Sequence, residues 1–285
     1  MNTDSHVLFE SGHNAVEGIG VSIVVTLYNY EKYIENALQS VFEQTHENLE
    51  LIVIDDASTD RSPSVAMKWL QENNERFSQT KLISHVRNAG LAQARNTGFD
   101  RASNECVFVL DADDEIYPTA ISRLLAACLS ADAQAAYSQI EIFGAARGII
   151  GGPWRPSGFE KGNYVAATAL IRKSAWSAVG GYTQPAEIQG WEDYDLWCKF
   201  VEHNLRGEFV PELLCRYRIH KSSMLRATSE AKLEQLKTAM KRRHPWLKLN
   251  EVPSVRDKLG YWYWLIRVRL MLARHALKQF ASRVT

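Results

Sequence analysis

Three acidic residues directly follow an apolar run near the middle of the chain. The run covers residues 107–110, and Asp111, Asp113 and Asp114 come after it. The pattern predicts a buried strand that carries these acids at its carboxyl end. Carboxylates this close repel one another unless a cation or hydrogen-bond donors offset their charge, and Mg²⁺ or Mn²⁺ is commonly held by one or two carboxylates plus substrate phosphates. The spacing therefore indicates a metal and diphosphate site. The alternative is a polar turn in which one Asp caps a helix beginning near Pro118.

Apolar strands and amphipathic helices alternate around these acids through residue 130. We expect strands at residues 21–25, 49–54, 81–86 and 107–110, each followed by a helix. This alternation predicts an α/β fold with a mostly parallel, doubly wound sheet and helices on both faces. Ligands of such sheets bind at the carboxyl ends of the strands. Four polar segments should therefore meet at one rim, which weakens the capping explanation: residues 26–29, 55–60, 87–96 and 111–114.

The strand and helix rhythm changes after residue 130. We expect a strand at residues 135–143, a long loop at 144–162 and a short helix that stops at Gly180-Gly181. A further helix begins near Trp191, and a strand at residues 213–219 ends at His220. Residues 1–19 lack periodicity and are predicted to be a flexible leader. A helical extension is expected over residues 229–285.

Composition excludes several classes of protein. Lys plus Arg (33) equals Asp plus Glu (33), so no overall positive field favours nucleic acid. The four cysteines form no CxxC pair and lie among apolar neighbours, which predicts buried free thiols in a reducing compartment. We find neither a signal peptide nor an apolar stretch long enough to cross a bilayer, and therefore expect a cytoplasmic protein. A dehydrogenase would need GxGxxG after the first strand, which is absent.

The last part of the chain is basic and aromatic. Residues 254–285 hold seven Lys or Arg against one acid, interleaved with Tyr, Trp and Leu. Such a helix can lie against anionic lipid or another protein, which predicts a peripheral contact at the inner face of the membrane. The alternative is a helix that packs its aromatic side chains on its own domain and leaves a basic face in solvent.

Taken together, the motifs resemble those of the family 2 glycosyltransferases of GT-A fold. The resemblance runs from about residue 21 to 224 and includes LIVIDDASTD, RNAGLAQARNTGF, VLDADD, GGY and WEDYDLW. It implies an inverting transfer of a sugar from a nucleotide-sugar, most commonly a UDP-sugar, to a hydroxyl of a growing polysaccharide or glycolipid. It also implies Mn²⁺ or Mg²⁺ as cofactor, a nucleotide-sugar-binding half at residues 20–132 and an acceptor-binding half at 133–228.

The resemblance also assigns roles to individual residues. Asp193 is placed as the general base. Asp113 is placed as the principal metal ligand, with Asp111 facing the ribose or the metal, and with His220 near the diphosphate and as a third candidate ligand. The residues expected to bind the nucleotide-sugar are Thr26, Tyr28, Asp55, Asp56, Arg87, Asn88, Arg95, Asp111, Ala112 and Asp113. The residues expected near the donor sugar or the acceptor are Trp154, Trp191 and Glu192.

Each assignment has a plainer alternative. Glu192 and Asp193 are also typical of the first turn of any helix, where acids favour the helix dipole. His220 can be a hydrogen-bonded histidine at a strand end. Two other functions remain open from the residues: a sugar nucleotidyltransferase, although the first loop lacks the usual Gly-rich basic signature, and a nucleotide-sugar-binding domain without turnover.

Overall fold

The computed structural model describes residues 4–13, 17–183, 186–220 and 233–249 of the chain. The chain divides into two compact units, Met1–Leu247 and Lys248–Thr285. Helix α8, Leu233–Arg243, lies in the predicted helical extension and belongs to the first unit. The predicted basic and aromatic tail, residues 254–285, is outside the described residues. Within the described residues, no helix has the length and apolar character that crossing a membrane requires.

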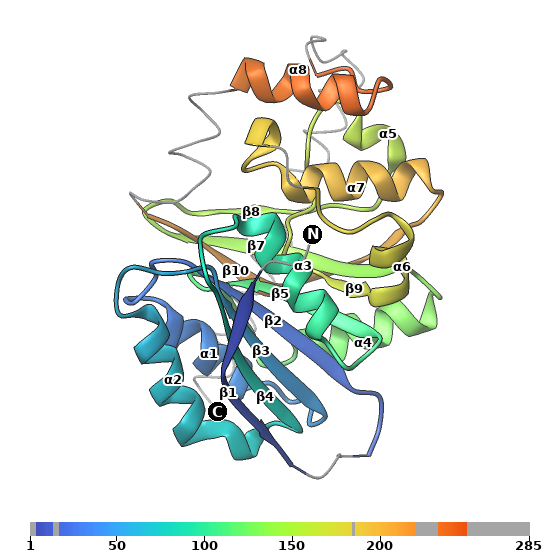
Figure 1. Cartoon of the computed structure of the whole chain (residues 1–285). Coiled ribbons are helices and arrows are strands. Elements are labelled where there is room, and N and C mark those ends of the chain that lie inside the picture. Colours follow the sequence, from blue (N-terminus) through green and yellow to red (C-terminus); the bar gives the residue numbers. More distant parts are fainter. Residues whose placement is uncertain (1–3, 14–16, 184–185, 221–232, 250–285) are drawn as a thin grey trace. The chain divides into compact units, whose positions relative to one another are not determined.

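One sheet of ten strands forms the centre of the described fold (Figure 1). Its order is β1-β4-β3-β2-β5-β9-β7-β10-β6, and β8 pairs with β7. Strands β2, β3, β4, β5, β7 and β10 run in one direction, so their carboxyl ends meet at one rim. The bounds are β1 Ser5–Gly12, β2 Val21–Leu27, β3 Leu49–Asp55, β4 Gln79–His85, β5 Cys106–Asp111, β6 Glu115–Ile116, β7 Ala135–Gly144, β8 Gly148–Ile150, β9 Leu170–Arg172 and β10 Gly207–Ile219.

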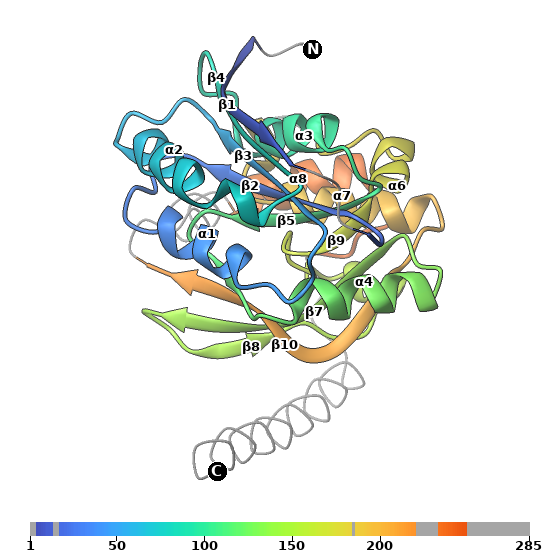
Figure 2. The ribbon, with the colours of Figure 1, turned by 90° about the horizontal axis from the view of Figure 1, so that it is seen from below.

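Helices cover both faces of the sheet, as the sequence predicts (Figure 2). Ile23 and Val25 of β2 pack in one apolar core with helices α1, α2 and α4. Val24 points the opposite way, because side chains alternate along a strand, and there helix α3 packs so closely that a Cβ on Gly98 would lie 2.2 Å from Val24. The helices are α1 Ile34–Phe42, α2 Ser62–Asn73, η1 Asn74–Arg76, α3 Leu91–Arg101, α4 Ala120–Ser130, α5 Pro156–Phe159, α6 Lys173–Ala178, η2 Ala186–Ile188 and α7 Glu192–Glu202.

Two local expectations need correction. The expected flexible leader over residues 1–19 contains strand β1, which pairs antiparallel with β4 at the sheet edge. This strand shows no clear alternation of apolar and polar residues, because its side chains remain at least partly exposed at the edge of the sheet. The expected long loop at 144–162 contains β8 and α5. Two other expectations are confirmed: Gly180 and Gly181 have φ of 73° and 67°, and all four cysteines are free and buried.

Candidate active site

Strained backbone shapes the rim where β2 and β3 end. Asn29 and Ala57 both have φ of 59°, a left-handed conformation that costs free energy in residues other than glycine. The side-chain oxygen of Asn29 accepts a hydrogen bond from the backbone N–H of Thr59 at 2.8 Å, which ties the two loops together. Tyr28, beside Asn29, is 42% exposed and projects from the same rim. Two of the four described non-glycine residues with positive φ therefore lie where the sequence predicts nucleotide binding.

Asp111, at the end of β5, is held by two neighbours. Thr26, its register partner on β2, donates its hydroxyl to Oδ1 at 2.8 Å. Arg95 on α3 donates Nη2 to both carboxylate oxygens at 3.0 Å. Burial lowers the pKa of Arg95, but the carboxylates around it, Asp111 first, raise it above its usual value overall. Arg95 is only 3% exposed, so the structure places it behind Asp111 rather than on the open surface of the rim.

Asp113 and His220 face each other across the rim. Asp113 Oδ2 lies 2.9 Å from His220 Nε2, and the imidazole stacks on Tyr33 with ring centroids 4.9 Å apart. Burial and the nearby Asp111 raise the pKa of Asp113, so this crowded carboxylate gains from a neighbouring cation. Asp114 is 1% exposed and accepts the backbone N–H of Arg218 at 2.9 Å, which makes it a structural acid.

The side chains of Asp113 and His220 suit a divalent ion whose coordination shell is completed by ligands from outside the chain. Among the described residues, no group of three or more His, Cys, Asp or Glu is arranged to hold a metal ion. The carboxylate of Asp113 and the imidazole of His220 supply two ligands of suitable chemistry, and phosphate oxygens of a donor would have to complete the shell. Asp111, the other predicted ligand, has its oxygens engaged by Arg95 and Thr26. Ala112 contributes backbone, and its N–H donates to Thr26 O at 3.0 Å.

The acids at the end of β3 organise the loop that follows β4. Asp56 accepts hydrogen bonds from the backbone N–H groups of Ala89 and Gly90 at 2.7 and 2.8 Å. His85 Nδ1 lies 2.7 Å from Asp56 Oδ1. Asp55 is similarly engaged and is 1% exposed. Both acids are buried, whereas Arg87 and Asn88 are exposed on the loop that Asp56 fixes.

Asp193 lies in the first turn of α7, and the charge of Arg95 acts on both Asp193 and Asp111. Asp193 is half-buried, and Asn163 Nδ2 donates to its Oδ2 at 2.8 Å. Burial raises the pKa of Asp193 to about 6, and the positive charge of Arg95 limits the rise. Glu192 beside it is 5% exposed, and burial raises its pKa as well. Asp193 is therefore a carboxylate that titrates near neutral pH, as a general base requires.

The two predicted tryptophans differ in their surroundings. Trp154 packs against Phe159 and Trp197, with ring centroids 4.9 and 6.0 Å away, and contributes to an aromatic cluster under α7. Trp191 lies at the start of α7 with its ring edge-on to Tyr194 at 5.6 Å. Trp191, unlike Trp154, is adjacent in the chain to Glu192 and Asp193.

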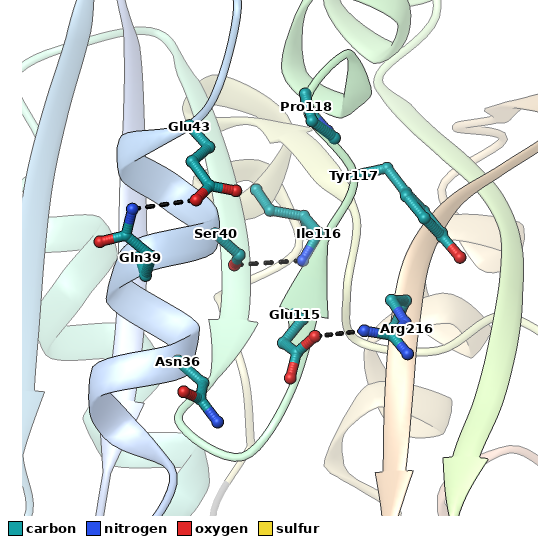
Figure 3. A pocket seen from close by; sticks show the side chains of 9 residues that line it. All are labelled: Asn36, Gln39, Ser40, Glu43, Glu115, Ile116, Tyr117, Pro118 and Arg216. Carbon is teal, nitrogen blue, oxygen red and sulfur yellow. Dashed lines mark hydrogen bonds and ion pairs between the residues drawn. The ribbon is translucent and has the colours of Figure 1, made fainter. Parts of the chain in front are cut away.

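A separate polar groove of about 390 Å³ lies between α1, β6 and β10 (Figure 3). Its charged groups have partners within its walls: Arg216 pairs with Glu115, and Glu43 accepts a hydrogen bond from Gln39 at 2.9 Å. None of the residues predicted from the sequence lines this groove. The candidate site is therefore the rim, not the groove.

Sequence reasoning missed the residues that hold the predicted ones in place. Asn163 supports Asp193, and His85 supports Asp56. Tyr182, in the GGY motif, places its ring 5.4 Å from the guanidinium of Arg95, and its hydroxyl is a buried group without a hydrogen-bond partner. The motif itself was a signal for Tyr182, but nothing in the sequence distinguishes Asn163 from other loop residues.

The chain is similar to known proteins over most of its length. The family model described as glycosyl transferase family 2 matches residues 22–183. EpsE of Bacillus subtilis (strain 168), a glycosyltransferase by name, is 27% identical over 209 residues, which are 70% of this chain and 73% of EpsE. A protein of Haemophilus influenzae described as an uncharacterized glycosyltransferase is 27% identical over 257 residues, 84% of this chain and 75% of that protein.

Solved structures share the fold. The Staphylococcus aureus TarS fragment 1–349 in complex with UDP-GlcNAc gives a TM-score of 0.62 at 17% identity, over 77% of this chain and 65% of the fragment. The mannosyltransferase PcManGT from Pyrobaculum calidifontis, in complex with GDP-Man and Mn²⁺, gives 0.59 at 21% identity, over 78% of this chain and 64% of that one. This chain thus spans just under two thirds of either protein, and the likeness establishes the fold alone.

Proposed function

This chain belongs to glycosyl transferase family 2, and we propose that it transfers a sugar from a nucleotide-diphosphate sugar to an acceptor hydroxyl with inversion at the anomeric carbon. The observation that carries this proposal is that the charge of Arg95 acts on two carboxylates, Asp111 and Asp193. We assign Asp111 to the metal and diphosphate side and Asp193, whose pKa is raised to about 6, to the acceptor side. This arrangement supports transfer rather than binding alone.

Asp193 is the general base. An attacking hydroxyl must lose its proton as its oxygen bonds to the anomeric carbon, and a carboxylate that titrates near neutral pH accepts this proton efficiently. Asn163 and the backbone N–H of Tyr194, each donating at 2.8 Å, orient the two carboxylate oxygens of Asp193. The neighbouring negative charge of Glu192 or Asp193 also favours the positive charge that develops on the sugar ring.

The leaving diphosphate is bound on the other side of the site. Asp113 and His220 would hold Mn²⁺ or Mg²⁺, and such an ion offsets the negative charge that develops on the β-phosphate. Arg95 remains charged beneath Asp111 and keeps this carboxylate in one orientation. Tyr28, Arg87 and Asn88, which are exposed on the rim, are available to contact the nucleoside.

UDP-sugars are the favoured donors, and a growing polysaccharide or a glycolipid is the favoured acceptor. The TarS fragment bound to UDP-GlcNAc supports UDP-sugars as donors. Because PcManGT is bound to GDP-Man and Mn²⁺, GDP-sugars are included in the test below. We place the acceptor near Trp191 and Glu192, and the protein at the inner face of the membrane through residues 254–285.

The deciding experiment measures nucleotide release from UDP-, GDP- and dTDP-sugars, with Mn²⁺, with Mg²⁺ and with EDTA. The expected result is release from one nucleotide class that depends on the metal and rises when acceptor is added. Asp193→Asn should bind the nucleotide as the wild type does and lose the acceptor-dependent part. A protein that binds the nucleotide but releases none from any donor would contradict the proposal.

A further inference from the structure

A second carboxylate on α7, Asp195, has no part in the chemistry above, yet three side chains form hydrogen bonds with it. Its side chain is 0% exposed. Oδ1 accepts a hydrogen bond from Arg243 Nε at 2.6 Å and lies 3.0 Å from His244 Nε2. Oδ2 accepts the hydroxyl of Thr183 at 2.7 Å. Residues far apart in the sequence thus converge on this one carboxylate.

Two further charged residues of α7 complete this cluster. Lys199 Nζ lies 3.7 Å from Asp195 Oδ2, and Glu202 Oε1 lies 2.7 Å from His244 Nδ1. Both ring nitrogens of His244 therefore face carboxylates, so the doubly protonated imidazolium satisfies both contacts. Arg243 and His244 immediately follow one another at the end of α8, and together they attach α8 to both ends of α7.

We propose that Arg243 and His244 are positioning residues for the reaction: acting through Asp195, they fix the first turn of α7 and thereby the carboxylate of Asp193. This inference rests on the proposed function. The backbone N–H of Asp195 donates to Trp191 O at 3.0 Å, which closes the turn that contains Asp193. A displacement of Asp195 would therefore also move the turn that contains Asp193.

The opposite face of α7 has its own anchor. Trp197 is fully buried and donates Nε1 to Val165 O at 2.8 Å. With Trp197 held on the core side and Asp195 held by α8, the helix is fixed on two faces against rotation about its axis. A displacement of a reacting group by about 1 Å can cost on the order of a hundredfold in rate. Without the α8 contacts, one of these two faces of α7 would lose its anchor.

The same cluster reaches the residue that tunes Asp193. Thr183 follows Tyr182, and Arg243 Nη2 donates to Thr183 Oγ1 at 3.1 Å. Tyr182 is 3% exposed and packs its ring against the guanidinium of Arg95. Arg95 limits the rise in the pKa of Asp193. Loosening the cluster should therefore alter both the position of Asp193 and the charge that it experiences.

The test replaces Arg243 in the full-length chain. Arg243→Gln removes the charge and Arg243→Lys keeps it. Lys237→Gln removes a lysine of the same helix that forms an ion pair with Glu234, also on α8. We expect Arg243→Gln to lower kcat about tenfold or more, with the KM for the donor changed less than twofold. Arg243→Lys should restore part of kcat, and Lys237→Gln should behave as the wild type.

A second measurement does not depend on turnover. The carboxyl carbon of Asp193 is titrated by ¹³C NMR in wild type and in Arg243→Gln, with assignment by Asp193→Asn. Groups that face Asp193 and contribute to its titration are Arg95, Glu192 and Asp111. A shifted Asp193 titration in Arg243→Gln supports the inference even when no donor is turned over, so failure of the proposed function remains distinguishable.

Two results would overturn the inference. One is an unchanged kcat together with an unchanged Asp193 titration in Arg243→Gln. The other is a loss of kcat that parallels a fall in Tm while the Asp193 titration is unchanged, because that is the result of a purely structural role. If Arg243→Gln does not fold, the double variant Asp195→Asn, Arg243→Gln removes both charges together, which buried ion pairs often tolerate. The same two readouts then decide.

Discussion

The pH dependence of transfer follows directly from the burial of Asp193. With a pKa of about 6 in place of the usual 3.8, roughly nine tenths of the Asp193 carboxyl groups are ionised at pH 7 and about one tenth at pH 5. The rate at saturating acceptor should therefore fall about tenfold between these values. An ordinary aspartate would still be about nine tenths ionised at pH 5 and would produce almost no fall.

Asp193→Asn separates chemistry from stability. Loss of a general base should lower kcat by about 10²- to 10⁴-fold, with little change in the affinity for the donor. A folded-state pKa above the unfolded value means that the fold disfavours the ionised carboxyl as pH rises. Because Asp193 is partly exposed, removing its charge should leave the free energy of unfolding at pH 7 unchanged or raise it by only about 1–2 kcal/mol.

The assay is a pH series of acceptor-dependent nucleotide release in constant-ionic-strength buffers, with urea unfolding of each variant at pH 7. Asp100→Asn, which removes an exposed carboxylate on α3, is the matched control and should keep the wild-type profile. The reasoning is refuted if the wild-type rate stays level from pH 7 to pH 5, or if Asp193→Asn transfers sugar at near the wild-type rate.

Three further predictions test the remaining assignments. Asp113→Ala should abolish the dependence of UDP affinity on Mn²⁺, measured by calorimetric titration; retention of that dependence would place the metal elsewhere. Arg76 donates hydrogen bonds to four backbone carbonyls between Phe42 and Glu47. Arg76→Gln should therefore lower the free energy of unfolding, measured in urea, by about 2–3 kcal/mol. The control Arg61→Gln, whose side chain is 83% exposed, should lower it by no more than about 0.5 kcal/mol. Deleting residues 254–285 should reduce binding to anionic vesicles; unchanged partitioning would remove the proposed membrane contact.

The sequence was sufficient for the parts of the molecule that depend on local pattern. The strands that end at Leu27, Asp55 and Asp111 were predicted within a few residues, because buried parallel strands consist largely of apolar residues. The strand that ends at His85 was predicted as closely, although it is only partly buried. Their common direction also predicted that their carboxyl ends meet at one rim, which the structure confirms. Strand β1 was missed because an edge strand carries no comparable apolar run.

The sequence could not show which polar side chains occupy the rim and which are buried behind it. Arg95 and Asp56 were both expected to bind the nucleotide-sugar. The structure shows that Arg95 lies under Asp111 and that both carboxylate oxygens of Asp56 accept hydrogen bonds from the next loop. Asp193 and Asp195 are two residues apart and identical in type. Only their neighbours make the two acids different. Burial raises the pKa of Asp193 to about 6, whereas hydrogen bonds from His244, Arg243 and Thr183 hold the pKa of Asp195 far below its usual range.

The sequence by itself thus determined the family, the order of the main parallel strands and the acids that come to the rim, since these depend on local hydrophobic pattern and on motifs. The tertiary structure alone decided the environment of each acid. Burial, nearby charge and hydrogen-bond partners come from segments distant in the chain, such as Arg95 for Asp111 and α8 for Asp195. These contacts set the pKa values and orientations of carboxylates that look alike in the sequence.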